Sequence, residues 1–138
     1  MNAEKLLFNW QLGRDLVQKK AEERWSAGIV EQVSLDLKRE FPDSTNFSVR
    51  NLWYMKQWYL FYAENLEKLK QSVSEFPLPF ACVPWGHHVR IVQHSKNIEE
   101  ALFYVGYTIR EGISRDILTR VMKALIPQHY YKYNFLST

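Results

Sequence analysis

Apolar residues recur at intervals of three and four along most of the chain, which is the period of an α-helix. The first such segment covers residues 3–24 and ends in the charged stretch QKKAEER. Its expected buried stripe is Leu6, Trp10, Gly13 and Val17. A glycine inside a helix costs stability, so we expect Gly13 to lie where a neighbouring helix packs closely.

The second segment covers residues 29–41, and Pro42 is expected to end it because proline cannot continue a helix. Its expected buried residues are Val30, Val33, Leu37 and Phe41. Ser48 then follows a loop and is a natural N-cap, since its hydroxyl can accept a hydrogen bond from the first turn of a helix. A third helix is therefore predicted over residues 49–62.

This third helix is richer in aromatic residues than one buried stripe requires. Its expected core side is Leu52, Met55, Tyr59 and Tyr62, and rings also lie on the opposite side. Three explanations remain open. The helix is packed on two sides, it binds a protein partner through Trp53, Tyr54 and Phe61, or it binds nucleic acid through Arg50, Asn51 and Lys56.

The stretch PLPFACVP, with its three prolines, predicts an extended connector with a short strand or wing near 78–84. Two helices are then predicted, one after Pro84 and one between Asn97 as N-cap and Gly112 as C-terminal stop. The expected stripe of the latter is Ile98, Leu102, Val105 and Ile109. Residues 63–76 are compatible with either a continued or a new helix.

A last helix is predicted from Ser114 to Ile126, where Pro127 ends it. Its expected core residues are Ile117, Leu118, Val121 and Leu125, and its other side is basic, with Arg115, Arg120 and Lys123. The stretches 47–55 and 113–122 share the order apolar residue, serine, arginine, leucine. This similarity suggests a pair of helix-turn-helix units.

The pattern as a whole predicts an all-α protein of about six helices with helix-turn-helix or winged-helix character. Residues 1–126 are expected to form one domain, with 127–138 as a linker or tail. The net charge of +3 permits a nucleic-acid partner without requiring one. The single cysteine, Cys82, and the lack of a long apolar run indicate a cytoplasmic protein that does not cross a membrane.

Candidate catalytic chemistry is sparse. His87 and His88 are adjacent, so on a helix their side chains diverge by about 100° and cannot share a metal, and His94 lacks a cysteine or carboxylate partner. A packing or capping role is expected for them, and a buried position for Cys82. The motif DLK at 36–38 lies on a predicted helix rather than a strand. We expect no catalytic residue, no metal site and no cofactor.

Several blocks nevertheless resemble one family in order and spacing. They are NWQLGRDLV (9–17), VSLDLKREFPD (33–43), FSVRNLWYMKQWYLFY (47–62), VPWGHHVRIV (83–92) and FYVGYTIREGISRDIL (103–118), followed by NF at 134–135. The chain is similar to the N-terminal domain of the YhcG-like family, bacterial proteins in which this domain usually precedes a PD-(D/E)xK nuclease domain. Ile113 stands where the family usually has tryptophan.

The resemblance implies a helical domain that binds DNA and brings a nuclease to it, without catalysis of its own. The residues expected to contact DNA are Arg50, Asn51, Lys56, Arg115, Arg120 and Lys123. The alternative is a protein-interaction module, in which Trp53, Tyr54 and Phe61 mediate homodimerisation or docking onto a nuclease partner.

Overall fold

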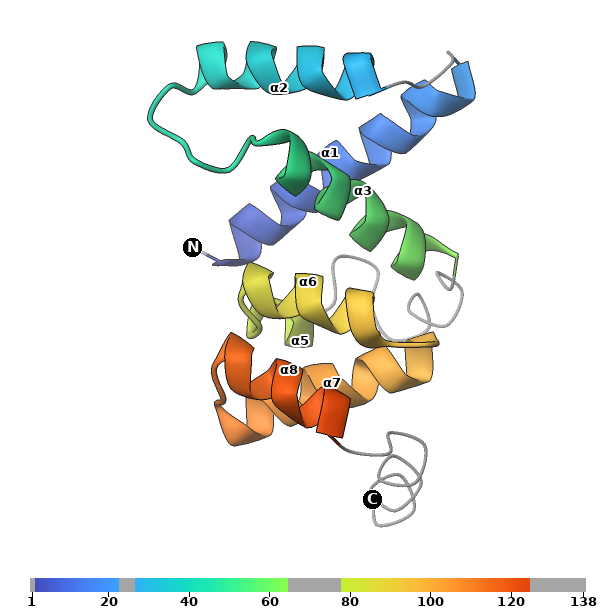
Figure 1. Cartoon of the computed structure of the whole chain (residues 1–138), viewed down its shortest axis with the longest axis vertical. Helices are drawn as coiled ribbons and strands as arrows, with labels where there is room; N and C mark the ends of the chain where they lie inside the picture. Colours follow the sequence, from blue (N-terminus) through green and yellow to red (C-terminus); the bar gives the residue numbers. More distant parts are fainter. Residues whose placement is uncertain (1, 23–26, 65–77, 125–138) are drawn as a thin grey trace. The chain divides into compact units, whose positions relative to one another are not determined.

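The computed structural model describes residues 2–22, 27–64 and 78–124, and these residues are helical apart from the connections (Figure 1). No strand occurs among them, so the prediction of an all-α protein is confirmed. The helices are α1 (Asn2–Glu22), α2 (Ala27–Glu40), α3 (Val49–Ala63), α5 (Leu78–Ala81), α6 (Trp85–His94), α7 (Ile98–Glu111) and α8 (Arg115–Ala124). The predictions for residues 65–76 and for the tail from 127 fall outside the described residues.

The described helices belong to two compact units, which we treat separately. The N-terminal unit spans Leu7–Glu64 and contains most of α1 together with α2 and α3. The C-terminal unit combines the first residues of the chain, through Leu6, with the residues from Asn65 onward, and it contains α5 to α8.

Close helix packing defines the core of the N-terminal unit. Gly13 of α1 lies against the backbone of α3, and a Cβ atom placed on it would be only 2.4 Å from the carbonyl oxygen of Met55. Beside this crossing, the Trp10 ring packs edge-on against Trp58 and Tyr59 at centroid distances of 5.5 and 4.8 Å. The predicted close approach at Gly13 is thus confirmed.

Helix α3 is packed on two sides, which accounts for most of its aromatic residues. It meets α1 at Gly13 and Trp10, and it also packs against α2. Its buried residues are Leu52, Met55, Lys56, Trp58 and Tyr62. Of its remaining rings, Tyr54, Tyr59 and Phe61 are half-buried, and Trp53 is exposed, at 37%.

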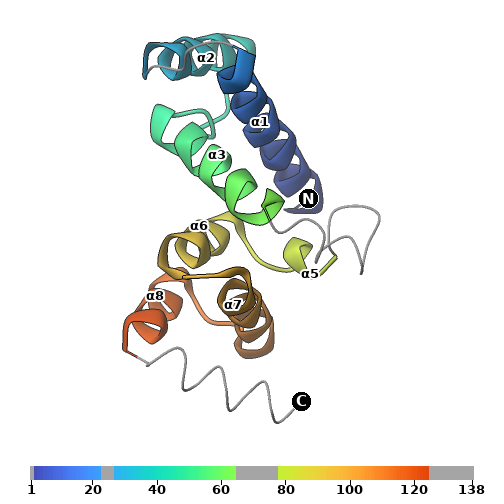
Figure 2. The ribbon, with the colours of Figure 1, turned by 90° about the vertical axis from the view of Figure 1, so that its right-hand side faces the viewer.

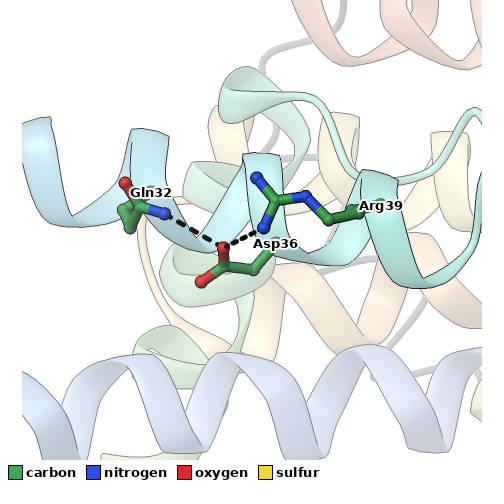
Figure 3. Close-up of polar contacts among 3 residues, drawn as sticks. All are labelled: Gln32, Asp36 and Arg39. Carbon is green, nitrogen blue, oxygen red and sulfur yellow. Dashed lines mark hydrogen bonds and ion pairs between the residues drawn. The ribbon is translucent and has the colours of Figure 1, made fainter.

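The outer side of α2 carries a small polar cluster (Figure 3). Asp36 accepts a hydrogen bond from Gln32 Nε2 at 3.0 Å and lies 3.9 Å from the guanidinium of Arg39. Both charged side chains are largely exposed, so this ion pair contributes little to stability. The DLK motif at 36–38 is therefore part of a solvated helix surface.

Helices α6, α7 and α8 form the core of the C-terminal unit, with α6 packed against both α7 and α8 (Figures 1 and 2). The four-residue helix α5 packs on α7. The prediction of a strand or wing near 78–84 is wrong, because Leu78–Ala81 form a helical turn that Val83 closes by donating its N–H to the carbonyl of Phe80. Asn2 holds this segment by donating to the carbonyls of Ala81 and Val83.

The three predicted helix caps are confirmed, whereas the predicted end at Ile126 lies outside the described residues. Ser48 and Asn97 cap α3 and α7 by accepting from the N–H groups of Asn51 and Glu100. Gly112 ends α7 in the left-handed conformation, at φ 60°, which favours glycine.

Several predicted buried stripes are rotated relative to the structure. On α7 the buried residues are Ile98, Ala101, Tyr104, Val105 and Thr108, together with Glu100, whereas Leu102 and Ile109 are exposed. On α8 they are Leu118, Thr119 and Met122, and Ile117 is exposed. On α1, Asn9 and Leu16 are buried while Trp10 and Val17 are half-buried. On α2, Ser34 is buried beside Val30, and Phe41 is exposed.

Candidate nucleic-acid interface

The connection between α7 and α8 has the form of a helix-turn-helix. Three residues, Gly112 to Ser114, join the two helices, and the left-handed glycine turns the chain. Ser114 then caps α8 by accepting from the N–H of Ile117 at 3.2 Å. A short turn containing glycine between two helices is typical of this motif, whose second helix is the one that enters a DNA groove.

Helix α6 packs against α8, and the two helices run in the same direction (Figure 1). Arg90 Nη1 on α6 donates to Thr119 Oγ1 on α8 at 3.0 Å, and these residues are 29 apart in the sequence. One turn earlier, a Cβ on Gly86 would lie 3.1 Å from Cδ of Arg115. One turn later, the charge of Lys123 contributes to lowering the pKa of His94. Side chains of α6 and α8 thus contact one another at Gly86 and at Arg90.

The start of α6 is fastened to the turn before α8. His87 Nε2 donates to the carbonyl of Ile113 at 2.8 Å, and the missing side chain of Gly86 leaves room for Arg115 beside the first turn of α6. His88 is fully buried, and its Nε2 donates to the carbonyl of Phe80 at 2.9 Å. Both histidines therefore have the packing role that the sequence predicts.

The exposed side of α8 is basic. Arg115, Arg120 and Lys123 are all exposed, and Arg120 and Lys123, three residues apart, lie on one side of the helix. Asp116 is an exposed acidic residue in the first turn of the same helix. Because Leu118, Thr119 and Met122 are buried, the basic side chains are held on a helix whose rotation is fixed by packing.

Arg90 adds the positive charge of α6 to this surface, and the pKa of His94 reflects the charges around it. Partial burial lowers the pKa of His94 below its usual value, and the nearby charges of Lys123 and Arg90 lower it further. We name the set Arg90, His94, Arg115, Arg120 and Lys123 the basic surface. Sequence reasoning missed Arg90 and His94, although their spacing of four on a helix was the available signal.

The residues of α3 expected to contact DNA have different environments. Arg50 is exposed near the start of α3. Asn51 donates from its side-chain amide to both oxygens of Asn46, at 2.7 and 3.0 Å, and so holds the preceding loop. Lys56 is only 8% exposed, and its ammonium lies 4.5 Å from the centre of the Trp53 ring. Of these three, Arg50 is the most accessible.

Metal-binding groups do not gather within the described part of the chain, where no three His, Cys, Asp or Glu side chains lie close enough to share an ion. Cys82 is exposed, which corrects the expectation that it is buried. None of the described helices is long and apolar enough to span a membrane.

Within the described residues the fold is all-helical, and a three-residue turn joins α7 to the basic helix α8. The model of the DUF1016 N-terminal domain matches residues 1–129, and the chain belongs to that family, in agreement with its resemblance to the N-terminal domain of the YhcG-like family. No curated protein and no solved structure matches the chain.

Proposed function

We propose that the chain is a non-catalytic DNA-binding domain and that α8 is its recognition helix. The observation that carries this proposal is the basic surface on a helix-turn-helix, with Arg120 and Lys123 exposed on α8 and Arg90 beside them on α6. Lysine and arginine side chains neutralise phosphates and release condensed counterions, so binding is expected to weaken steeply with salt.

The first turns of α6 and α8 suggest how the domain is positioned on the duplex. Pro84 is the N-cap of α6 and makes no side-chain capping bond, and the Arg115 guanidinium lies beside Gly86. The free backbone N–H groups at the start of a helix, together with an arginine guanidinium, favour the binding of a phosphate. In this arrangement Arg115 contacts the backbone while Arg120 and Lys123 lie along the groove.

Following the family resemblance, we propose that the domain delivers a nuclease domain to DNA inside the bacterial cytoplasm. The alternative, a protein-interaction module on α3, draws on the exposed side chains of Trp53 and Leu60, which are seven residues apart on one side of the helix. Tyr54 and Phe61 are half-buried and offer such a partner less area.

Fluorescence-anisotropy titrations of duplex, single-stranded and branched DNA test the proposal. The variant Arg120→Glu/Lys123→Glu is expected to bind duplex DNA roughly 100-fold more weakly than the native chain, because two phosphate contacts become repulsive. The slope of log affinity against log salt should also fall by about two.

A matched control carries the same change in charge elsewhere. Lys38→Glu/Arg39→Glu alters two exposed residues in the last turn of α2 and should leave binding within about threefold of the native chain. An equal loss in both variants would show that only net charge matters, and absence of native binding at low salt would refute the proposal. Arg50→Glu shows separately whether the start of α3 contributes.

A further inference from the structure

The end of α6 places a histidine inside the basic surface. His94 lies in the last turn of α6, four residues after Arg90, so the two residues share one side of the helix. His94 is exposed, whereas Arg90 is half-buried. Because histidine is the side chain whose charge changes near neutral pH, the total charge of the basic surface depends on the state of this ring.

Cations from two helices act on His94. Arg90 donates to Thr119 of α8 at 3.0 Å, and Lys123 lies one turn after Thr119 on the same helix. Partial burial is the main cause that lowers the pKa of His94, and the charges of Lys123 and Arg90 lower it further. In the free chain His94 is therefore mostly neutral at pH 7.

The start of α7 brings acidic groups near the end of α6. Glu99 and Glu100 lie in the first turn of α7. Glu100 is buried, and its carboxylate accepts a hydrogen bond from the backbone N–H of Lys96, two residues after His94, at 3.4 Å. Glu99 is half-buried and Lys96 is exposed. The charges that shift the pKa of His94 are nevertheless the cations of α6 and α8, both of which disfavour its protonated form.

A phosphate bound at the basic surface reverses this balance. An anion beside His94 stabilises the imidazolium, and a charge-assisted hydrogen bond from the ring to a phosphate oxygen adds to the effect. The Arg90 guanidinium has five N–H donors and gives one to Thr119, so others can bind the same phosphate. Proton binding at His94 and phosphate binding at the surface therefore favour each other.

We propose that DNA binding at the basic surface is coupled to the uptake of one proton by His94. This inference rests on the proposed function and adds to it a dependence of DNA affinity on pH. In the complex the protonated ring joins Arg90 and Lys123 in neutralising phosphate. The affinity should therefore rise as the pH falls, by up to about tenfold per pH unit, because a single proton is bound.

Fluorescence-anisotropy titrations of the full chain with a DNA duplex at pH 6, 7 and 8 and constant ionic strength test the proposal. The native affinity is expected to rise roughly five- to tenfold between pH 8 and pH 6. His94→Gln cannot be protonated and should stay within about twofold over this range. His94→Lys keeps its charge and should bind at pH 8 about as tightly as the native chain does at pH 6.

Two further measurements assign the effect to His94. His87→Gln is the matched control, because it removes another histidine of α6 that lies outside the basic surface, and it should keep the native pH dependence. An NMR titration of the histidine ring protons follows protonation directly, and the midpoint for His94 should rise when the duplex is added.

The outcomes separate this inference from the proposed function. Duplex binding that does not change between pH 6 and pH 8, a His94 midpoint that the duplex leaves unchanged, or native pH dependence in His94→Gln would overturn the coupling. Each of these results leaves DNA binding itself standing. Absence of binding at every pH would refute the proposed function and the coupling with it.

Discussion

Replacing Gly13 by alanine is expected to destabilise the N-terminal unit by about 3 kcal/mol, although alanine is the better helix former. The new Cβ would lie 2.4 Å from the carbonyl oxygen and 2.9 Å from the carbonyl carbon of Met55, and 3.1 Å from Cβ of Tyr59. The first two atoms are backbone of α3, so the clash can be relieved only by moving one helix against the other.

Gly106→Ala is the matched control, because Gly106 also lies inside a helix but a Cβ placed on it would meet no atom of the described residues within 4 Å. This substitution should stabilise the chain by about 0.5–1 kcal/mol through helix propensity alone. Urea unfolding measures both variants. The fluorescence of Trp10 and Trp58 reports on the N-terminal unit, and that of Trp85 on the C-terminal unit. A stabilised Gly13→Ala variant would contradict the helix packing described here.

The stability of the C-terminal unit is expected to fall as the pH drops from about 6.5 towards 4. Burial is the main cause that lowers the pKa of His88 from 6.5 to about 4, and the neighbouring His87 lowers it too, while hydrogen bonds with the Phe80 and Val83 backbone oppose the shift. Between these values the unfolded chain binds a proton that the folded chain does not. The contribution of neutral His88 to the stability of the native state is therefore fully present above pH 6.5, and it is lost as the pH falls towards 4.

The expected loss is about 2 kcal/mol by pH 5 and about 3 kcal/mol once the pH is below 4, where both states are protonated. Urea unfolding between pH 7.5 and 5, followed through Trp85, measures it before most carboxylates titrate. His88→Gln should flatten the profile, whereas His87→Gln, at a half-buried position, should not. A native chain equally stable at pH 7.5 and 5 would show that His88 is not held neutral by burial.

Helix boundaries could be predicted from the sequence because capping is local. The hydroxyl of Ser48, the amide oxygen of Asn97 and the left-handed Gly112 each act within one turn of the chain. The assignment to an all-α fold followed from the helical period together with these ends. Prolines were less informative, since Pro79 lies inside the short helix α5 rather than in a strand.

The rotation of the helices could not be predicted because polar residues occupy buried positions. Thr108 and Thr119 are buried and donate their hydroxyl protons to the carbonyls of Tyr104 and Arg115, one turn earlier, at 2.8 and 3.0 Å. A threonine whose hydroxyl makes such a hydrogen bond within its own helix can be buried like an apolar residue. A pattern that counts threonine as polar instead assigns Leu102 and Ile109 to the core.

The sequence allowed only part of the candidate site to be predicted. Arg115, Arg120 and Lys123 are exposed as expected, because charged side chains avoid burial wherever the core lies. Lys56 is the exception, since its aliphatic stem can be buried while its ammonium rests on the ring of Trp53. The spacing of Arg90 and His94 shows only that they share one side of α6, and their place beside α8 depends on packing that joins residues 29 positions apart in the sequence.

The most direct test of the central claim is a two-dimensional amide NMR titration of the isotope-labelled chain with a short DNA duplex at low salt. We expect chemical-shift changes concentrated in α8, at Arg115–Ala124, and in α6 near Arg90 and His94. Changes confined to α3 around Arg50 and Trp53, or no changes at all, would contradict the assignment of α8 as the DNA-contacting helix.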